Sequence, residues 1–445
     1  MEQTSRKEKF QRKRSHSKNK KRRRLATTVL IVSFFTLAIL FWITYNSAQK
    51  QEATPPGQTA NPGTSSSGGD VPAGGTGKPD PGGANVPSTG TPKPGDTGSA
   101  GGTPTDSGKT PGTGTTEPSG SAGAGAGAGQ DDPNRVQLTF VGDVIFADNV
   151  EATLKRNGYD YPYKNVQSYL EKADLTIANL ETPITERGTA QIKQYAYRST
   201  PAALPAFKQA GIDLVNLANN HILDYGTTGL LDTFSHLDKN GIRWFGAGRN
   251  VTEAFKPVII EIKGMKIAFI GLSKVVPSTD WKAGKNTPGV ADTYALTLPL
   301  QTIEKAKKEA DLVVVVAHWG LERHDMPEAY QKDYARQYID AGADLIIGGH
   351  PHVLQGFENY KGKWIAYSLG NFIFTMNEDP VTWETVILQA SCSKDGGCEL
   401  QAVPVLTKLA NPEPMAEEAA VKLFKRLTDI SFGAQINKEG IISTK

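Results

Sequence analysis

The stretch ADLIIGGHPHV, residues 343–353, places two histidines one residue apart, directly after a short apolar run and a pair of glycines. The whole chain holds only seven histidines. At this spacing His350 and His352 can lie on one side of an extended segment, and Pro351 keeps that segment out of a helix. The two glycines let the backbone pass close to a site. The stretch therefore predicts a buried strand that ends in a pair of metal-binding imidazoles.

Four other apolar runs in the same part of the chain also end in polar side chains. These runs alternate with helical segments, which is typical of buried, at least partly parallel strands in an α/β fold. In open α/β sheets, ligands bind beyond the carboxyl ends of the strands, so we expect the polar side chains to converge at one sheet edge. The residues at these four strand ends are Asp143, Asn179, Glu181, Asn219, Asn220, His221 and His318.

Imidazole, carboxylate and amide oxygen are ligands that suit a divalent metal such as Mn, Fe or Zn. Any one of these residues taken alone is more simply explained as a cap or a packed polar side chain. Five strands with such ends at equivalent positions favour one shared site, which we predict holds one or two ions. Asp224 follows His221 by three residues and could orient its ring.

The N-terminal part of the chain predicts a membrane anchor. Residues 1–24 hold twelve Lys or Arg and two Glu, a net charge of +10 within a total of +3. Residues 25–45 are uncharged, and 21 such residues suffice to cross the ~30 Å hydrocarbon core. The preceding basic tail predicts a cytoplasmic N-terminus. A cleaved signal peptide is the alternative, although its apolar region is normally ~7–15 residues long.

Residues 46–134 are rich in Gly, Pro, Ser and Thr, and no aromatic residue occurs between Tyr45 and Phe140. Such a composition cannot offset the entropy of ordering, so we expect a disordered linker. The folded domain should span 135–445. With the tail removed, the remaining 421 residues carry a net charge of about −7, since +3 minus +10 leaves −7. The basic tail is explained by membrane topology and anionic lipid, so we expect no nucleic-acid partner.

The two cysteines, Cys392 and Cys398, enclose the turn sequence SKDGG between two alternating strands. Outside the cell, the expected state of such a pair is a disulfide that clasps the hairpin. A zinc site is less favoured, because structural zinc needs four ligands.

Several of these segments together resemble the CapA family, also called PgsA, of poly-γ-glutamate capsule biosynthesis proteins. The matching stretches, between residues 140 and 374, are FVGDVIF, ADLTIANLETPIT, GIDLVNLANNHILDYG, AHWGLE, ADLIIGGHPHVLQGFE and YSLGNFIF. That family is similar in turn to calcineurin-like metallophosphoesterases. The resemblance implies a β-sandwich flanked by helices with a divalent metal site, preceded here by one transmembrane helix and the linker.

The resemblance also implies roles for individual residues. Glu181 stands where a bridging aspartate is expected, and His221 matches a catalytic histidine. The implied metal ligands are Asp143, Glu181, Asn220, His318, His350 and His352. Two departures matter: the first motif is normally Asp-x-His but here reads Asp143-Val144-Ile145, and the second is normally Gly-Asp-x-x-Asp but here reads Asn179-Leu180-Glu181. One imidazole ligand is therefore missing, which places the two-metal hydrolytic mechanism in doubt.

Two functional hypotheses follow. In the first, the chain is a single-pass, extracellular component of a poly-γ-glutamate synthesis or export complex in a Gram-positive-type cell membrane, with other membrane subunits and the anionic polymer as partners. In the second, it is an active metal-dependent hydrolase in which His221 and Asp224 are catalytic. We assign Asn179, Arg198 and Asn371 to substrate binding. Weak basic signals for polymer binding come from Lys193, Lys274, Lys282 and Lys285.

Overall fold

The computed structural model describes residues 132–375 and 378–445. The predicted tail, the predicted membrane span at 25–45 and nearly all of the predicted linker lie outside these residues. Within the described part of the chain, no helix is both long enough and apolar enough to cross a bilayer. The first element of that part is strand β1, Arg135–Val144.

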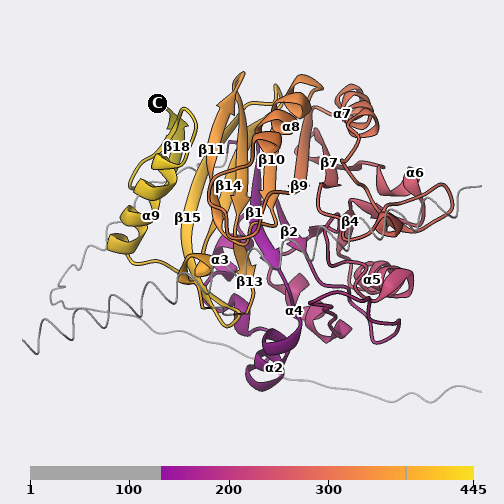
Figure 1. Ribbon diagram of the computed structural model, residues 1–445. Helices are drawn as coiled ribbons and strands as arrows, with labels where there is room; N and C mark the ends of the chain where they lie inside the picture. Colours follow the sequence, from indigo (N-terminus) through magenta and orange to yellow (C-terminus); the bar gives the residue numbers. More distant parts are fainter. Residues whose placement is uncertain (1–131, 376–377) are drawn as a thin grey trace, which may run out of the picture. The chain divides into compact units, whose positions relative to one another are not determined.

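Two β-sheets dominate the described residues (Figure 1). In the larger sheet, β1 to β4 run parallel to one another, and β14 and β15 continue the sheet antiparallel on the other side of β1. Its strand order is β17 (Ala434–Ile436), β18 (Ile441–Thr444), β15 (Cys398–Lys408), β14 (Glu384–Ser393), β1, β2 (Leu175–Leu180), β3 (Leu214–Asn216) and β4 (Arg243–Phe245), with β13 (Asn371–Ile373) on β1 and β16 (Asn411–Pro414) on β15.

The smaller sheet has a parallel centre and antiparallel edges. Strands β7, β9, β10 and β12 are parallel, whereas β6 and β11 pair antiparallel at the two edges. Strands β6 and β7 pair as a hairpin that turns at Lys263-Gly264. The order is β11 (Leu354–Tyr360), β12 (Lys363–Leu369), β10 (Leu345–Gly349), β9 (Leu312–His318), β7 (Met265–Ser273) and β6 (Val258–Ile262); β5 (Ala247–Gly248) pairs separately with β8 (Gly289–Val290).

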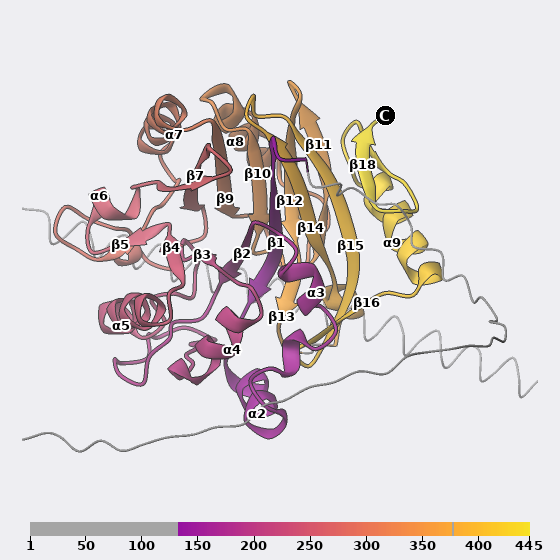
Figure 2. The same cartoon turned by 180° about the vertical axis from the view of Figure 1, so that it is seen from behind.

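The two sheets pack face to face, and helices cover their outer faces (Figure 2). Side chains alternate along β1 as a strand requires: Leu138 and Phe140 enter the core between the sheets, and Val141 enters the outer core. One helix group covers the larger sheet, α2 (Asp148–Asn157), α3 (Gln167–Leu170), α4 (Leu204–Gln209) and α5 (Gly226–Lys239), while α7 (Thr297–Glu309) and α8 (Ala329–Asp340) cover the smaller one. The predicted α/β sandwich flanked by helices is thus present.

Two further α-helices, α6 and α9, lie in the described part of the chain. The short helix α6, Val251–Ala254, lies against β5 and β8. Helix α9, Glu417–Asp429, packs Leu423, Phe424 and Leu427 into the core between the sheets, next to β11 and β17.

Residues 363–374 form one apolar run in the sequence but two strands in the structure. Gly370 adopts φ +70°, a left-handed conformation that glycine tolerates best, and the chain turns there. Strand β12 stays in the smaller sheet, whereas β13 joins the larger sheet and pairs with β1. This crossover places Asn371 directly opposite Asp143.

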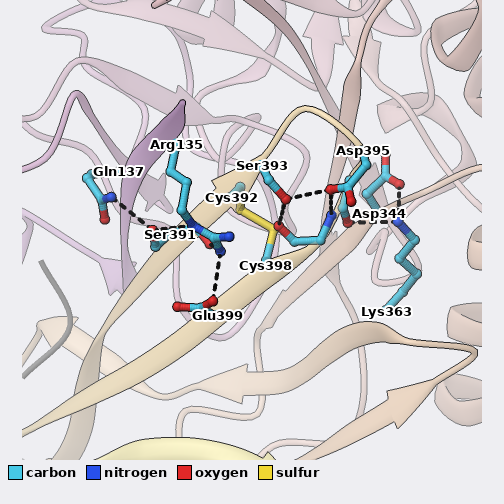
Figure 3. The surroundings of a disulfide bond; sticks show 12 residues. Arg135, Gln137, Asp344, Lys363, Ser391, Cys392, Ser393, Asp395, Cys398 and Glu399 are labelled. Atoms are coloured by element: carbon cyan, nitrogen blue, oxygen red, sulfur yellow. Dashed lines mark hydrogen bonds and ion pairs between the residues drawn. A yellow bond between two sulfur atoms is a disulfide. The ribbon is translucent and has the colours of Figure 1, made fainter. Parts of the chain in front are cut away.

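The predicted disulfide is confirmed: Cys392 and Cys398 are bonded and close the β14–β15 hairpin (Figure 3). The turn between them is held to the smaller sheet, because Lys363 Nζ donates to the Gly396 carbonyl at 2.7 Å and pairs with Asp344 at 2.7 Å. The disulfide hairpin therefore links the two sheets at the end where β1 begins.

Candidate metal centre

Strand register brings the predicted site residues to one level. Asp143 on β1 pairs with Asn179 on β2, and Asn179 pairs in turn with Asn216 on β3. In the smaller sheet, His318 at the end of β9 pairs with Gly349 at the end of β10.

The expectation of a single sheet edge is wrong, because β9 and β10 belong to the other sheet. The carboxyl ends of the two parallel sets meet across the sandwich instead. A Cβ added to Gly349 would lie 2.7 Å from Asp143 Oδ1, so the absence of a side chain at 349 lets the sheets approach here.

Glu181 is common to two groups of metal-binding side chains. Its carboxylate lies with His350 and His352 in one group and with Asp143 and His318 in the other, and the ligand atoms in each group lie within 4.8 Å of one another. All five residues are buried. A shared carboxylate with nitrogen and oxygen ligands on both sides suits one or two divalent ions of the Mn, Fe or Zn type.

The centre also holds most of the unsatisfied polar atoms. Among the described residues, five buried side-chain polar atoms have no hydrogen-bond partner, and three are Glu181 Oε1, Glu181 Oε2 and His350 Nδ1. Glu181 Oε1 lies 3.3 Å from His318 Nε2, but that nitrogen faces Asn220 Oδ1 at 2.7 Å. An unpaired buried carboxylate is costly unless a cation accompanies it, so the side chains fit a metal.

Asp143 is held as an anion by its neighbours. Burial alone would raise its pKa, but the hydrogen bond and charge of His352, with help from His318 and Asn179, lower the pKa below its usual value. Asp143 Oδ2 lies 3.2 Å from His352 Nδ1 and accepts the backbone N–H of His350 at 3.1 Å.

The two histidines of the opening stretch differ in electrostatic setting. Burial, together with His318 and His352, lowers the pKa of His350 well below its usual value. Burial also acts to lower the pKa of His352, but Glu181 and Asp143 outweigh it and raise that pKa to about 9. A metal ligand must be the neutral imidazole, and His350 already meets that condition.

Backbone strain marks the same two residues. His350 has φ +95° and His352 has φ +58°, in a region that residues other than glycine rarely adopt. Such strain persists where the surrounding structure fixes the conformation, and it concentrates at functional sites. Two strained residues on either side of Pro351 therefore support a functional role for this turn.

A second cluster forms around His221, in the turn after β3. Its Nδ1 lies 2.7 Å from Asp224 Oδ2. Asp224 is fully buried and also accepts from Lys193 Nζ at 2.6 Å and from the Tyr197 backbone N–H at 2.7 Å. Lys193 further donates to the Asn220 carbonyl at 2.8 Å. The sequence had suggested Lys193 only as a polymer contact; its position at Asp224 had no local signal, since 31 residues separate them.

The three predicted substrate-binding residues lie in different settings. Asn179 donates to Asp143 Oδ1 at 2.7 Å, and Asn371 Oδ1 lies 2.9 Å from His352 Nδ1, so both amides hold metal-centre side chains. Arg198 is exposed and lies over the Tyr225 ring at 4.5 Å, and none of its interactions in the described residues reaches the metal centre. Substrate binding by all three stays a prediction.

Two further asparagines support the site: Asn216, which the sequence reasoning missed, and Asn219, which it placed at a strand end without giving it a role. Asn216 donates to Asn179 Oδ1 at 2.9 Å. Asn219 donates to the Leu180 carbonyl at 2.8 Å and accepts the His221 N–H, which fixes the turn against the end of β2. Both sit in the run LVNLANN, where their polar character within an apolar strand was the available signal.

At the position where the first motif would normally supply an imidazole, the structure places the side chain of Ile145. Ile145 is a buried apolar side chain, and its backbone N–H bonds to the Ile373 carbonyl at 2.9 Å. It offers no ligand to the centre.

Comparison with known proteins shows that the segment holding the candidate metal ligands matches one protein family. Residues 137–376 match the family described as Bacterial capsule synthesis protein PGA_cap. The chain is 34% identical over 289 residues to the PGA biosynthesis protein CapA of Bacillus subtilis (strain 168), which covers 64% of this chain and 75% of that protein. It is 33% identical over 318 residues to the capsule biosynthesis protein CapA of Bacillus anthracis, covering 68% of this chain and 76% of that protein.

A more distant relative is a probable polyglutamine synthesis accessory protein of Mycobacterium tuberculosis (strain CDC 1551 / Oshkosh). It is 31% identical over 229 residues, covering 48% of this chain and 59% of that protein. All of the predicted metal ligands lie inside the family match at 137–376.

Proposed function

Since the chain belongs to the bacterial capsule synthesis protein family PGA_cap, we propose that it serves in the synthesis or export of poly-γ-glutamate through the metal centre at its strand ends. In this proposal the N-terminal segment anchors the chain in the cell membrane. The folded domain is extracellular, works beside other membrane subunits of the complex, and has a metallophosphoesterase-like architecture. The disulfide supports an oxidising, extracellular setting.

The observation that carries the proposal is Glu181. Its carboxylate is buried, both oxygens lack a hydrogen-bond partner, and it belongs to both groups of metal-binding side chains. Asp143 and His318 would hold an ion on one side, and His350 and His352 on the other, with Asn220 beside His318. When bound, a divalent ion would supply Lewis-acid polarisation of a substrate oxygen.

A hydrolase is the second candidate, and the His221 cluster favours it. Asp224 Oδ2 is close enough to accept from Nδ1–H of His221, and Lys193 already has oxygen acceptors on Asp224 and Asn220. That arrangement leaves Nε2 as the atom that exchanges a proton with substrate. His221 would then protonate a leaving group, while Asp224 keeps its ring in place. The substrate bond would be an ester, phosphoester or amide.

Complementation tests the proposed function. The full chain would be expressed in a poly-γ-glutamate-producing bacterium that lacks its own homologue, and released polymer would be measured. We expect the wild type to restore polymer and Glu181→Gln not to do so at equal protein level. Failure of the wild type to restore polymer would contradict the proposed function; equal restoration by both would contradict the role of the metal centre.

A further inference from the structure

A recess of about 550 Å³ opens beside the metal centre, and His350 forms part of its wall. Its other walls come from the loops that follow β7, β8 and β9 and from the first turn of α8, including Lys274, Tyr294, Leu321 and Tyr330. The recess is the only feature among the cavities described that combines a metal-centre residue with a cationic side chain and aromatic rings.

Lys274 is half-buried in this recess without a counter-ion. Its ammonium lies 4.2 Å from the ring centre of Tyr294 and donates to the hydroxyl of Tyr334 at 3.2 Å. No ion pair of the described residues includes it. Lys282 shares the Tyr294 ring at 4.2 Å but is paired with Asp292 at 3.0 Å. Of the two lysines at this ring, only Lys274 has its charge available for a ligand.

The backbone ties Lys274 to the metal centre. Residue 274 directly follows β7, and its N–H donates to the carbonyl of His318 at 2.8 Å. Because His350 lines the same recess, a ligand held by this ammonium would lie next to the metal centre.

We propose that Lys274 and the tyrosine-lined recess bind a carboxylate of the substrate and thereby set the orientation in which the substrate chain reaches the metal centre. This inference rests on the proposed function, because it takes the substrate to be a chain of carboxylate-bearing units. The ammonium would meet one carboxylate, and the apolar wall formed by Val275, Val276 and Pro277 would contact the methylene groups of that unit.

The recess suits a carboxylate better than a phosphate. Phosphate sites usually offer a bidentate arginine or several backbone N–H groups at a helix N-terminus, whereas the charge here is a single ammonium among aromatic rings. Glu322 also lines the recess, and its charge would oppose a doubly charged anion more than a singly charged one. Replacing it by glutamine should therefore strengthen carboxylate binding.

Titration calorimetry with the full chain in detergent tests the inference. The probes are a γ-linked glutamate oligomer, its amidated and therefore uncharged counterpart, and inorganic phosphate. The variants are Lys274→Met, Lys274→Arg and Glu322→Gln. The matched control is Lys332→Met, since Lys332 is also half-buried over an aromatic ring, 4.7 Å from the centre of Phe432, but does not line the recess.

We expect Lys274→Met to weaken oligomer binding about tenfold or more, Lys274→Arg to retain most of it, and Glu322→Gln to strengthen it. The control should bind as the wild type does, the amidated oligomer should not distinguish the variants, and metal content should be the same in all. Equal oligomer binding by wild type and Lys274→Met would overturn the proposed role of the recess in carboxylate binding and leave the proposed function intact. A wild type that binds no oligomer overturns both, and a Lys274-dependent affinity for phosphate alone overturns the carboxylate assignment.

Discussion

The metal centre and the His221 cluster occupy neighbouring strand ends, but they differ in how well their side chains satisfy one another. In the metal centre, Glu181 and His350 keep three buried polar atoms without partners. In the His221 cluster, the buried Asp224 accepts from a lysine, a histidine and a backbone N–H. The first arrangement leaves buried polar atoms unpaired, which a bound cation would satisfy, whereas the side chains of the second satisfy one another.

This difference suggests distinct roles for the two clusters. The metal centre is suited to bind a ligand, whereas the His221 cluster is suited to hold the His221 ring in one orientation. Changes in the metal centre should alter what the protein binds. Changes around His221 should alter what the protein does once its ligands are bound. The predictions below test that separation, beginning with the largest expected effect.

Glu181→Gln should remove bound metal. The substitution keeps the shape and deletes the charge shared by both ligand groups, so we expect metal affinity to fall by more than about 100-fold. Metal content measured by mass spectrometry on the purified full chain would show it. Added Mn²⁺ or Zn²⁺ at about 100 times the wild-type Kd should stabilise the wild type by about 2.7 kcal/mol and the variant by less than about 0.4 kcal/mol, seen as a shift in melting temperature.

The matched control is Glu186→Gln, five residues further along the same segment, where the side chain is exposed. It should bind metal as the wild type does. Stoichiometric metal in Glu181→Gln would show that Glu181 is a buried acid with no part in an ion site.

His221→Ala should leave metal content and melting temperature close to those of the wild type. If the domain is a hydrolase, cleavage of a generic phosphodiester should fall by about 10²–10⁴-fold, the usual contribution of a positioned acid or base. His236→Ala, on α5, is the control. A variant that loses metal as well would show that the two clusters are not separate. Unchanged polymer release would favour a non-catalytic component of the synthesis or export complex over the hydrolase.

Much of this comparison could be predicted from the sequence, because strand ends carry local signals. Apolar runs followed by Asp143, Glu181, His318 or His350 were sufficient to identify the buried strands and the residues that meet there. The parallel register of β1 with β2 and of β9 with β10 then brings those residues together.

The division into two sheets could not be read from the same runs. Both sheets have buried parallel centres, and a buried strand shows the same apolar pattern in either of them. The turn at Gly370 and the position of Lys193 beside Asp224 depend on contacts between distant segments. Periodicity describes neighbours along the chain and carries no information about such contacts.

Lys193→Met should have a smaller effect than His221→Ala. Asp224 would lose one of three donors while keeping His221 and the Tyr197 N–H, so the ring stays in place but is held less firmly. We expect about a tenfold loss of hydrolysis or polymer release, with unchanged metal content. Lys208→Met is the control, since Lys208 pairs with Asp213 at 2.6 Å outside the cluster. An effect equal to that of the control would show that Lys193 does not contribute to the function of the His221 cluster.

The smallest effect on the site should come from removing the disulfide, which lies where β1 begins, whereas the metal centre lies where β1 ends. The bond closes a short loop, with a sequence separation of 6, so replacing both cysteines by serine should cost about 2 kcal/mol, seen as a lower urea midpoint. Lys363 would still hold Gly396 and Asp344 (Figure 3), so the hairpin should stay attached to the smaller sheet. Metal content should therefore match the wild type; a loss of metal would mean that the sandwich transmits strain along the whole length of β1 and that the centre depends on both ends of that strand.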